Sequence, residues 1–207
     1  DSWYDDGWYD DSGQCDDGWT DDGASDDSSA GSEVLATFAV RSEALDTRGA
    51  NSALARNATR IWNRFVALIP RDRRPRVTSF ELLESSDTSA WVYENDNSTW
   101  TLGVARDLAD GWELDDTLVH ETGHLVTLNT DQIRSGGGAC TTYRFEPEGC
   151  ARTGSIADRF MRQFWTAAMR SAANRGDDLS SRYPGSFVSE YAGTDPAEDI
   201  AETFASF

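Results

Sequence analysis

The sequence predicts an α+β domain with a small sheet, a buried histidine-bearing helix and a helical C-terminal lobe. A leucine-rich run of helical spacing contains both histidines of the chain, His120 and His124. Three strand-like runs precede it, and two amphipathic helical runs follow it. We expect this domain to span residues 33–207 and the segment 1–32 to lie outside it.

Residues 1–32 have the composition of a disordered acidic tail. They are mostly Asp, Gly, Ser and aromatic residues, and they contain eleven of the 37 acidic residues and no basic residue. Such low aliphatic content cannot offset the entropy of ordering the segment. Asp-Asp-Gly-Trp occurs at Asp5–Trp8 and Asp16–Trp19, a repeat whose spacing matches neither an EF-hand loop nor a Ca²⁺-binding β-roll. The composition favours a solvated linker over a Ca²⁺ or partner site.

The formal net charge is −19. Such a charge argues against nucleic acid and anionic membrane surfaces as partners. No run of the sequence reaches the roughly 18 apolar residues that a membrane span requires. The sequence leaves the oligomeric state unknown.

The first part of the domain is predicted to hold a helix and three strands. Val34–Val40 fits a strand or a helix equally well. Asn51–Leu68 is predicted to be a helix, because apolar residues form one stripe along it and Pro70 follows as a stop. The strand-like runs are Val77–Leu83, Ala90–Tyr93 and Trp100–Ala105. The last run is the closest to the histidine helix, so it could add an extended substrate along a free edge; an ordinary sheet strand is the alternative.

The two histidines belong to the motif His120-Glu121-Thr122-Gly123-His124. Positions four apart on a helix share a face, with Cβ atoms roughly 5–6 Å apart, so one Zn²⁺ ion can bridge both imidazoles. Glu121 lies around the helix from them, where it can reach a water at the open side of the metal without being a ligand. This H-E-x-x-H pattern is typical of zinc peptidases in which the glutamate is the general base.

The alternative to a metal site is a surface helix that carries two histidines by chance. Apolar residues at helical spacing flank the motif and predict a mostly buried helix from about Asp115 to Leu128. Unpaired His and Glu side chains would be costly to bury there, and a metal removes that cost. Asp115, Asp116 and Thr117 are the N-cap candidates. Gly123 inside a helix is unfavourable by about 1 kcal/mol, so we expect another element to approach it closely.

The three cysteines of the chain indicate the redox compartment in which the protein acts. Cys140 and Cys150 flank a short polar loop, and a disulfide between them is favoured over a second pair of zinc ligands. A disulfide implies an oxidising, extracytoplasmic compartment. Cys15, in the tail, is left without a partner by this pairing. It could be a free thiol, form an intermolecular disulfide, or bind the zinc as a thiolate.

Two helices are predicted after the cysteine loop. The first spans about Ser155–Ala173, with an apolar stripe of Ile156, Phe160, Phe164 and Met169 for the core. The second starts at Asp195, a good N-cap followed by proline at the first helical position. We expect it to continue to the last residue, Phe207.

The third protein ligand of a catalytic zinc is expected to be a carboxylate, because the chain has no third histidine. Glu198 and Glu202 are four apart on one face of the final helix. One could bind zinc while the other accepts an N–H from a ligating histidine. Glu198 also has capping-box spacing from Asp195, and Glu202 could be a solvated side chain. Spacing alone leaves the choice between them open.

The segment Tyr191–Ala205 resembles the distal segment of the gluzincin metallopeptidases related to the anthrax lethal factor catalytic domain. The motif helix, Thr117–Leu125, is similar to that of a group of bacterial zinc-binding metallopeptidases. The resemblance implies a zincin-like metallopeptidase domain in which Glu198 is the ligand and Glu202 supports a ligand. Tyr191 would then donate a hydrogen bond to the transition state. Glu198 lies 74 positions after His124, farther than in compact gluzincins, which leaves the shape of the cleft open.

Motif and resemblance together predict a secreted or cell-surface bacterial zinc metalloendopeptidase that acts on a peptide or protein substrate. An aminopeptidase is disfavoured, because no glutamate-rich motif precedes the zinc helix. The alternative is a catalytically silent, zinc-bearing surface binding module. The presence of Glu121 and the lack of an evident fourth ligand count against that alternative.

Overall fold

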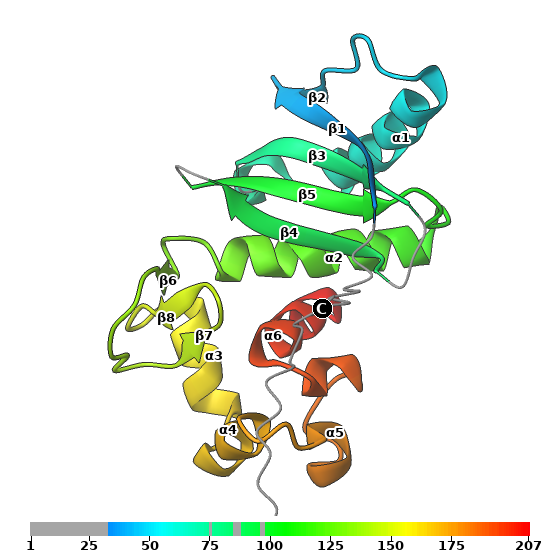
Figure 1. The fold of residues 1–207 in the computed structure, drawn as a ribbon. Coiled ribbons are helices and arrows are strands. Elements are labelled where there is room, and N and C mark those ends of the chain that lie inside the picture. The colour runs from blue at the N-terminus through cyan, green and yellow to red at the C-terminus, as the bar shows by residue number, and fades with distance from the viewer. Residues whose placement is uncertain (1–32, 75, 85–87, 96–97) are drawn as a thin grey trace, which may run out of the picture. The chain divides into compact units, whose positions relative to one another are not determined.

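The computed structural model describes residues 33–74, 76–84, 88–95 and 98–207. The proposed acidic tail, with Cys15, lies outside the described residues. The described part is an α+β structure with a five-stranded mixed sheet, a small three-stranded sheet and six α-helices (Figure 1). The strands are β1 (Val34–Arg41), β2 (Ala44–Leu45), β3 (Val77–Leu83), β4 (Ala90–Asn95), β5 (Thr99–Ala105), β6 (Ile133–Arg134), β7 (Arg144–Phe145) and β8 (Gly149–Ala151). The helices are α1 (Ser52–Leu68), α2 (Trp112–Thr127), α3 (Ile156–Phe164), α4 (Ala167–Ala173), α5 (Leu179–Arg182) and α6 (Pro196–Ala205), with 3₁₀ helices η1 (Arg71–Arg73) and η2 (Tyr191–Gly193).

The large sheet has the strand order β2-β1-β3-β5-β4. Only β3 and β5 are parallel, and the other pairs are antiparallel. The open choice for Val34–Val40 is thus resolved as a strand. The three predicted strands are confirmed within one or two residues. Of the two alternatives for Trp100–Ala105, the ordinary sheet strand is the one that the structure shows. β5 pairs on both sides, and β4 is the edge strand instead.

Helices α1 and α2 cover the same face of the large sheet (Figure 1). Asn51 caps α1 by accepting a hydrogen bond from the Ala53 backbone at 2.8 Å. Trp62 and Phe65 of α1 are buried, and the Trp62 ring meets Phe80 of β3 edge-on at 6.0 Å between centroids. Each such side chain contributes roughly 1.5–3 kcal/mol when it is buried. The apolar stripe predicted for this helix is what holds it on the sheet.

Helix α2 begins at Trp112, three residues earlier than predicted. Its N-cap is Gly111, at a φ of 115°, and no side chain caps the helix. The expected N-caps are wrong because Asp115 lies inside the first turn and pairs with Arg64 of α1, with Nε 2.5 Å from Oδ1. Thr117 likewise donates to the Glu113 carbonyl within the helix. The predicted leucines of this helix are buried as expected.

The helix predicted over Ser155–Ala173 is two helices, α3 and α4. The chain leaves α3 at Trp165, which is in extended conformation, and Thr166 caps α4 by accepting from the Met169 backbone. The Trp165 indole N–H donates to Asp199 of α6 at 2.8 Å, inside the core. This contact turns the tryptophan inward and breaks the helix.

The break also changes which side chains are in the core. Ile156 is 43% exposed and Phe164 is 52% exposed, so the expected four-residue stripe is only half correct. Phe160 packs against the core and Met169 lies within it. The buried residue beside them is Trp165.

Helix α6 packs against α2 below the sheet (Figure 1). Asp195 caps it, as predicted, by accepting from the Ala197 backbone at 2.7 Å. The helix ends at Ala205, and Ser206 is its C-cap. The expected continuation to Phe207 is therefore wrong.

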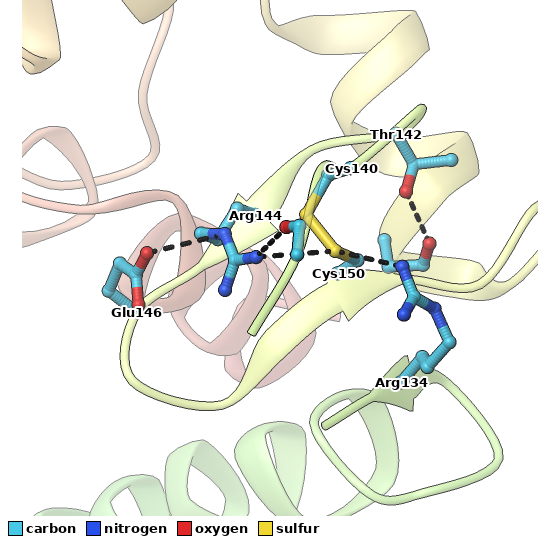
Figure 2. The surroundings of a disulfide bond; sticks show 8 residues. Arg134, Cys140, Thr142, Arg144, Glu146 and Cys150 are labelled. Carbon is cyan, nitrogen blue, oxygen red and sulfur yellow. Dashed lines mark hydrogen bonds and ion pairs between the residues drawn. A yellow bond between two sulfur atoms is a disulfide. The ribbon is translucent and has the colours of Figure 1, made fainter. Parts of the chain in front are cut away.

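The small sheet has the order β6-β8-β7 and carries the disulfide Cys140–Cys150, which confirms the predicted pairing. Figure 2 shows that Arg134 and Arg144 lie beside it, with guanidinium N–H groups 3.3 and 3.7 Å from the Cys150 sulfur. No helix in the described ranges is both long enough and apolar enough to cross a membrane.

Candidate metal centre

Three ligand atoms converge where α2 meets α6. Nε2 of His120 and Nε2 of His124 are 3.1 Å apart. Oε2 of Glu198 lies 3.1 Å from the first nitrogen and 3.3 Å from the second. One turn of α2 supplies both imidazoles, and the first turn of α6 supplies the carboxylate. The three residues form a cluster that could hold a metal ion.

The spacing fits a tetrahedral ion. Ligands at about 2.0–2.1 Å from such an ion are about 3.3 Å from one another. Glu198 Oε2 is buried, and apart from the two imidazole nitrogens it has no polar partner among the described residues. An oxygen buried in this way is costly unless something coordinates it. The cluster therefore fits a metal, and its geometry alone does not identify which one.

A chain of hydrogen bonds orients His120. Its Nδ1 lies 2.7 Å from Oε1 of Glu202, one turn after Glu198 on α6. Ser189 donates to the other Glu202 oxygen at 2.6 Å and accepts from the Ala192 backbone at 2.9 Å. A ligand whose Nδ1–H is held by a carboxylate presents Nε2 to the metal. The sequence interpretation missed Ser189, whose only signal was its place two residues before Tyr191.

His124 lacks this support. Its Nδ1 is buried and has no hydrogen-bond partner among the described residues. Metal-ligating histidines usually donate from the second nitrogen. The two histidines of the cluster are thus held differently, His120 by a side-chain network and His124 by packing.

The charges of the cluster are coupled. Burial raises the pKa of Glu198, but hydrogen bonds from His120 and His124 outweigh it and lower this pKa to about 2. Burial lowers the pKa of His120, whereas its hydrogen bond to Glu198 and the charges of Glu121 and Glu198 raise it to about 9. Without a metal, the cluster therefore keeps a proton at neutral pH. A divalent cation would replace it.

Glu121 is buried beside the ligands, with only 6% of its surface exposed. Its Oε2 has no partner among the described residues. Burial is the main cause that raises the pKa of Glu121 to about 7, against the opposing charges of His124 and His120. A carboxyl group with such a pKa can accept and return a proton near neutral pH.

Tyr191 lies on η2, beside the cluster. The residue is 54% exposed, and its ring centroid is 5.9 Å from that of His120. Burial of the hydroxyl and the charge of Glu198 raise its pKa well above the usual value. The hydroxyl therefore stays protonated and can donate a hydrogen bond.

Two cavities meet at the cluster. One of about 630 Å³ extends along β4 to Glu94 and the turn between β7 and β8. The other, of about 390 Å³, extends from Ala90 toward Thr88 and Asp116. His120, Glu121 and Tyr191 line both. The edge strand β4 therefore borders a cleft that passes over the cluster.

Comparisons of the chain with protein-family models, with curated proteins and with solved structures found no match. The sequence-predicted residues His120, Glu121, His124, Tyr191, Glu198 and Glu202 all lie at this centre.

Proposed function

We propose that this chain is a zinc-dependent endopeptidase of the gluzincin type with a zincin-like fold. One observation supports the proposal most: three possible ligand atoms lie 3.1–3.3 Å apart beside the buried carboxylate of Glu121, one oxygen of which has no partner in the described part of the chain. A structural metal site needs no such carboxylate. The pairing of an open ligand set with a buried base is the arrangement that hydrolysis needs.

Zinc is the metal we propose for the cluster. Two imidazoles and one carboxylate are a ligand set that catalytic zinc commonly has, with the fourth position left for water or substrate. When bound, zinc acts as a Lewis acid that polarises the peptide carbonyl and makes water more acidic.

Side chains of the protein transfer the protons, stabilise the oxyanion and orient the histidine ligand. Glu121 accepts the proton of the attacking water and passes it to the leaving amine. The Tyr191 hydroxyl donates to the oxyanion that forms on the former carbonyl, a contact worth on the order of 3 kcal/mol. Glu202 keeps His120 in the tautomer that presents Nε2.

The peptide would add to the exposed edge of β4. Strand addition uses the free backbone groups of an edge strand and holds the substrate extended along the cleft. The antiparallel direction is favoured because its hydrogen bonds are slightly more stable. Substrate residues before the scissile bond would then lie toward Glu94, and those after it toward Ala90 and Thr88.

The disulfide is consistent with an oxidising compartment. We therefore propose that the enzyme acts outside the cytoplasm, in secreted form or at a cell surface.

The test is metal-dependent cleavage of a mixed peptide library, with products identified by mass spectrometry. The protein should cut internal peptide bonds, stop after treatment with a chelator, and recover when one equivalent of Zn²⁺ is restored. Cleavage that persists after full metal removal would show that this centre is not responsible.

A further inference from the structure

The larger cavity at the metal centre is acidic on both of its walls. Beyond the cluster itself, Glu94 lines it from β4, and Glu146 and Glu148 line it from the turn between β7 and β8. No arginine is among the described residues that line it, and the chain has no lysine. The charge of this cavity is therefore complementary to a cation.

Glu94 lies on β4 opposite Trp100 of β5 and lines the cavity. Val92, Trp100 and Leu128 also line it. A hydrogen bond from Ser98 reaches the Glu94 carboxyl group, but its Oε1 is buried without a partner among the described residues. Burial raises the pKa of this group. An ionised oxygen in such surroundings is costly unless a cation or a donor comes to it.

Glu148 lies on the opposite wall and is half-buried. Within the described ranges its carboxylate has no ion-pair partner, whereas the neighbouring Glu146 pairs with Arg144 at 3.4 Å (Figure 2). Gly149 follows at a φ of 133°, and a Cβ there would lie 2.4 Å from the Arg134 carbonyl oxygen. This close approach and the disulfide at Cys150 constrain the backbone that follows Glu148.

A separate observation indicates that this cavity receives a ligand. Glu121 is more than nine-tenths buried, lines the same cavity, and has an oxygen without a hydrogen-bond partner among the described residues. Buried polar groups without partners are rare in folded proteins and need an explanation. A hydrogen-bond donor that enters the cavity, such as a water molecule, would satisfy this oxygen.

We propose that this cavity is a subsite for a cationic side chain of the peptide substrate, lysine or arginine, held between Glu94 and Glu148. The inference rests on the proposed peptidase function. The aliphatic part of the side chain would lie along Val92 and Leu128, and its charged end would contact the two carboxylates. With the peptide antiparallel to β4, the cationic residue lies one or two positions before the scissile bond.

Binding tests this subsite without relying on turnover. Zinc-loaded Glu121→Gln protein is offered an array of extended peptides whose members differ only by Arg, Lys, Gln or Glu at one position. We expect the Arg and Lys members to bind at least roughly tenfold more tightly than the Gln member. Adding Glu94→Gln or Glu148→Gln should remove most of this difference. The control is Asp131→Asn, which removes one negative charge at an exposed residue outside the cavity lining. It should leave the preference for Arg and Lys unchanged.

Equal affinity for the Arg and Gln members would overturn the subsite. So would a preference that survives loss of both carboxylates, or one that Asp131→Asn weakens as much as they do. Cleavage of the same peptides by the wild-type protein distinguishes a failure of the subsite from a failure of the proposed peptidase function. Cutting without a basic preference contradicts the subsite alone. A preference in binding that depends on Glu94 and Glu148, without any cutting, contradicts the peptidase function alone.

Discussion

Gly123 of α2 lies directly against the backbone of Ala201 in α6. A Cβ at position 123 would lie 2.8 Å from the Ala201 Cα, closer than such atoms approach in proteins. This glycine, in the helical turn between His120 and His124, therefore allows the close helix contact that brings Glu198 to them. This explains a glycine in a helix interior, where we expected another element to approach closely.

Gly123→Ala tests that contact. Alanine favours the helix by about 1 kcal/mol over glycine, but here its methyl group must push α6 away. We expect a net loss of about 1–3 kcal/mol in the free energy of unfolding and weaker zinc binding, measured by urea unfolding and by zinc titration. The control is Glu113→Ala, at an exposed position of the same helix. A Gly123→Ala protein as stable as the wild type would show that the two helices can separate at no cost.

Ser189→Ala tests the hydrogen bonds that orient His120. The change frees one oxygen of Glu202 and the Ala192 N–H, so both the ligand support and the turn that carries Tyr191 lose a contact. We expect zinc affinity to fall roughly tenfold, as measured with a competing chelator, and kcat to fall more than KM rises. Ser171→Ala, in α4 and outside this network, serves as control. Zinc affinity unchanged in Ser189→Ala would assign the serine to local turn structure only.

Zinc affinity should depend on pH in a defined direction. The hydrogen bond to Glu198 and nearby negative charges outweigh burial and raise the pKa of His120 to about 9 in the metal-free protein, so a proton must leave before Nε2 can bind zinc. Affinity should therefore rise about tenfold per pH unit for one released proton, and level off near pH 9. Calorimetry in buffers of different ionisation enthalpy counts the proton released. Binding at pH 7 without proton release would contradict this description of the site.

Asp199 should make the metal-free protein less stable as the pH rises. Burial raises its pKa from 3.8 to about 6, although the Trp165 N–H opposes this. Between about pH 4 and pH 6 the unfolded chain ionises this group while the folded protein keeps the proton, so stability falls in that window, by up to about 3 kcal/mol. Above pH 6 the effect is constant. Asp199→Asn should lack this decline when unfolding is measured by denaturant at several pH values; identical pH profiles for both proteins would refute the assignment.

Periodicity and caps predicted the elements whose structure is set locally. Asp195 caps the helix that its position indicates, and the leucine spacing of α2 predicted its buried face. The break between α3 and α4 was not predictable, because the inward turn of Trp165 depends on Asp199, 34 residues away.

The candidate site, like the fold, was predictable from local sequence patterns only in part. Spacing placed His120 and His124 on one face, but it left Glu198 and Glu202 equivalent. The angle and contact between α6 and α2 distinguish them, since one carboxylate reaches Nε2 and the other Nδ1 of His120. Likewise, the identity of β4 as the edge strand follows from pairing across the sheet, which local patterns do not encode.

The most direct test of the proposed function compares wild-type and Glu121→Gln proteins, each loaded with one zinc per chain. Zinc content and the cleavage rate of the same library peptide are measured on the same samples. We predict equal zinc content and a loss of at least about a hundredfold in cleavage by the variant, because only the proton acceptor is removed. Equal cleavage by both proteins, or no cleavage by a wild type that holds its zinc, would contradict the peptidase account and favour a zinc-bearing binding module.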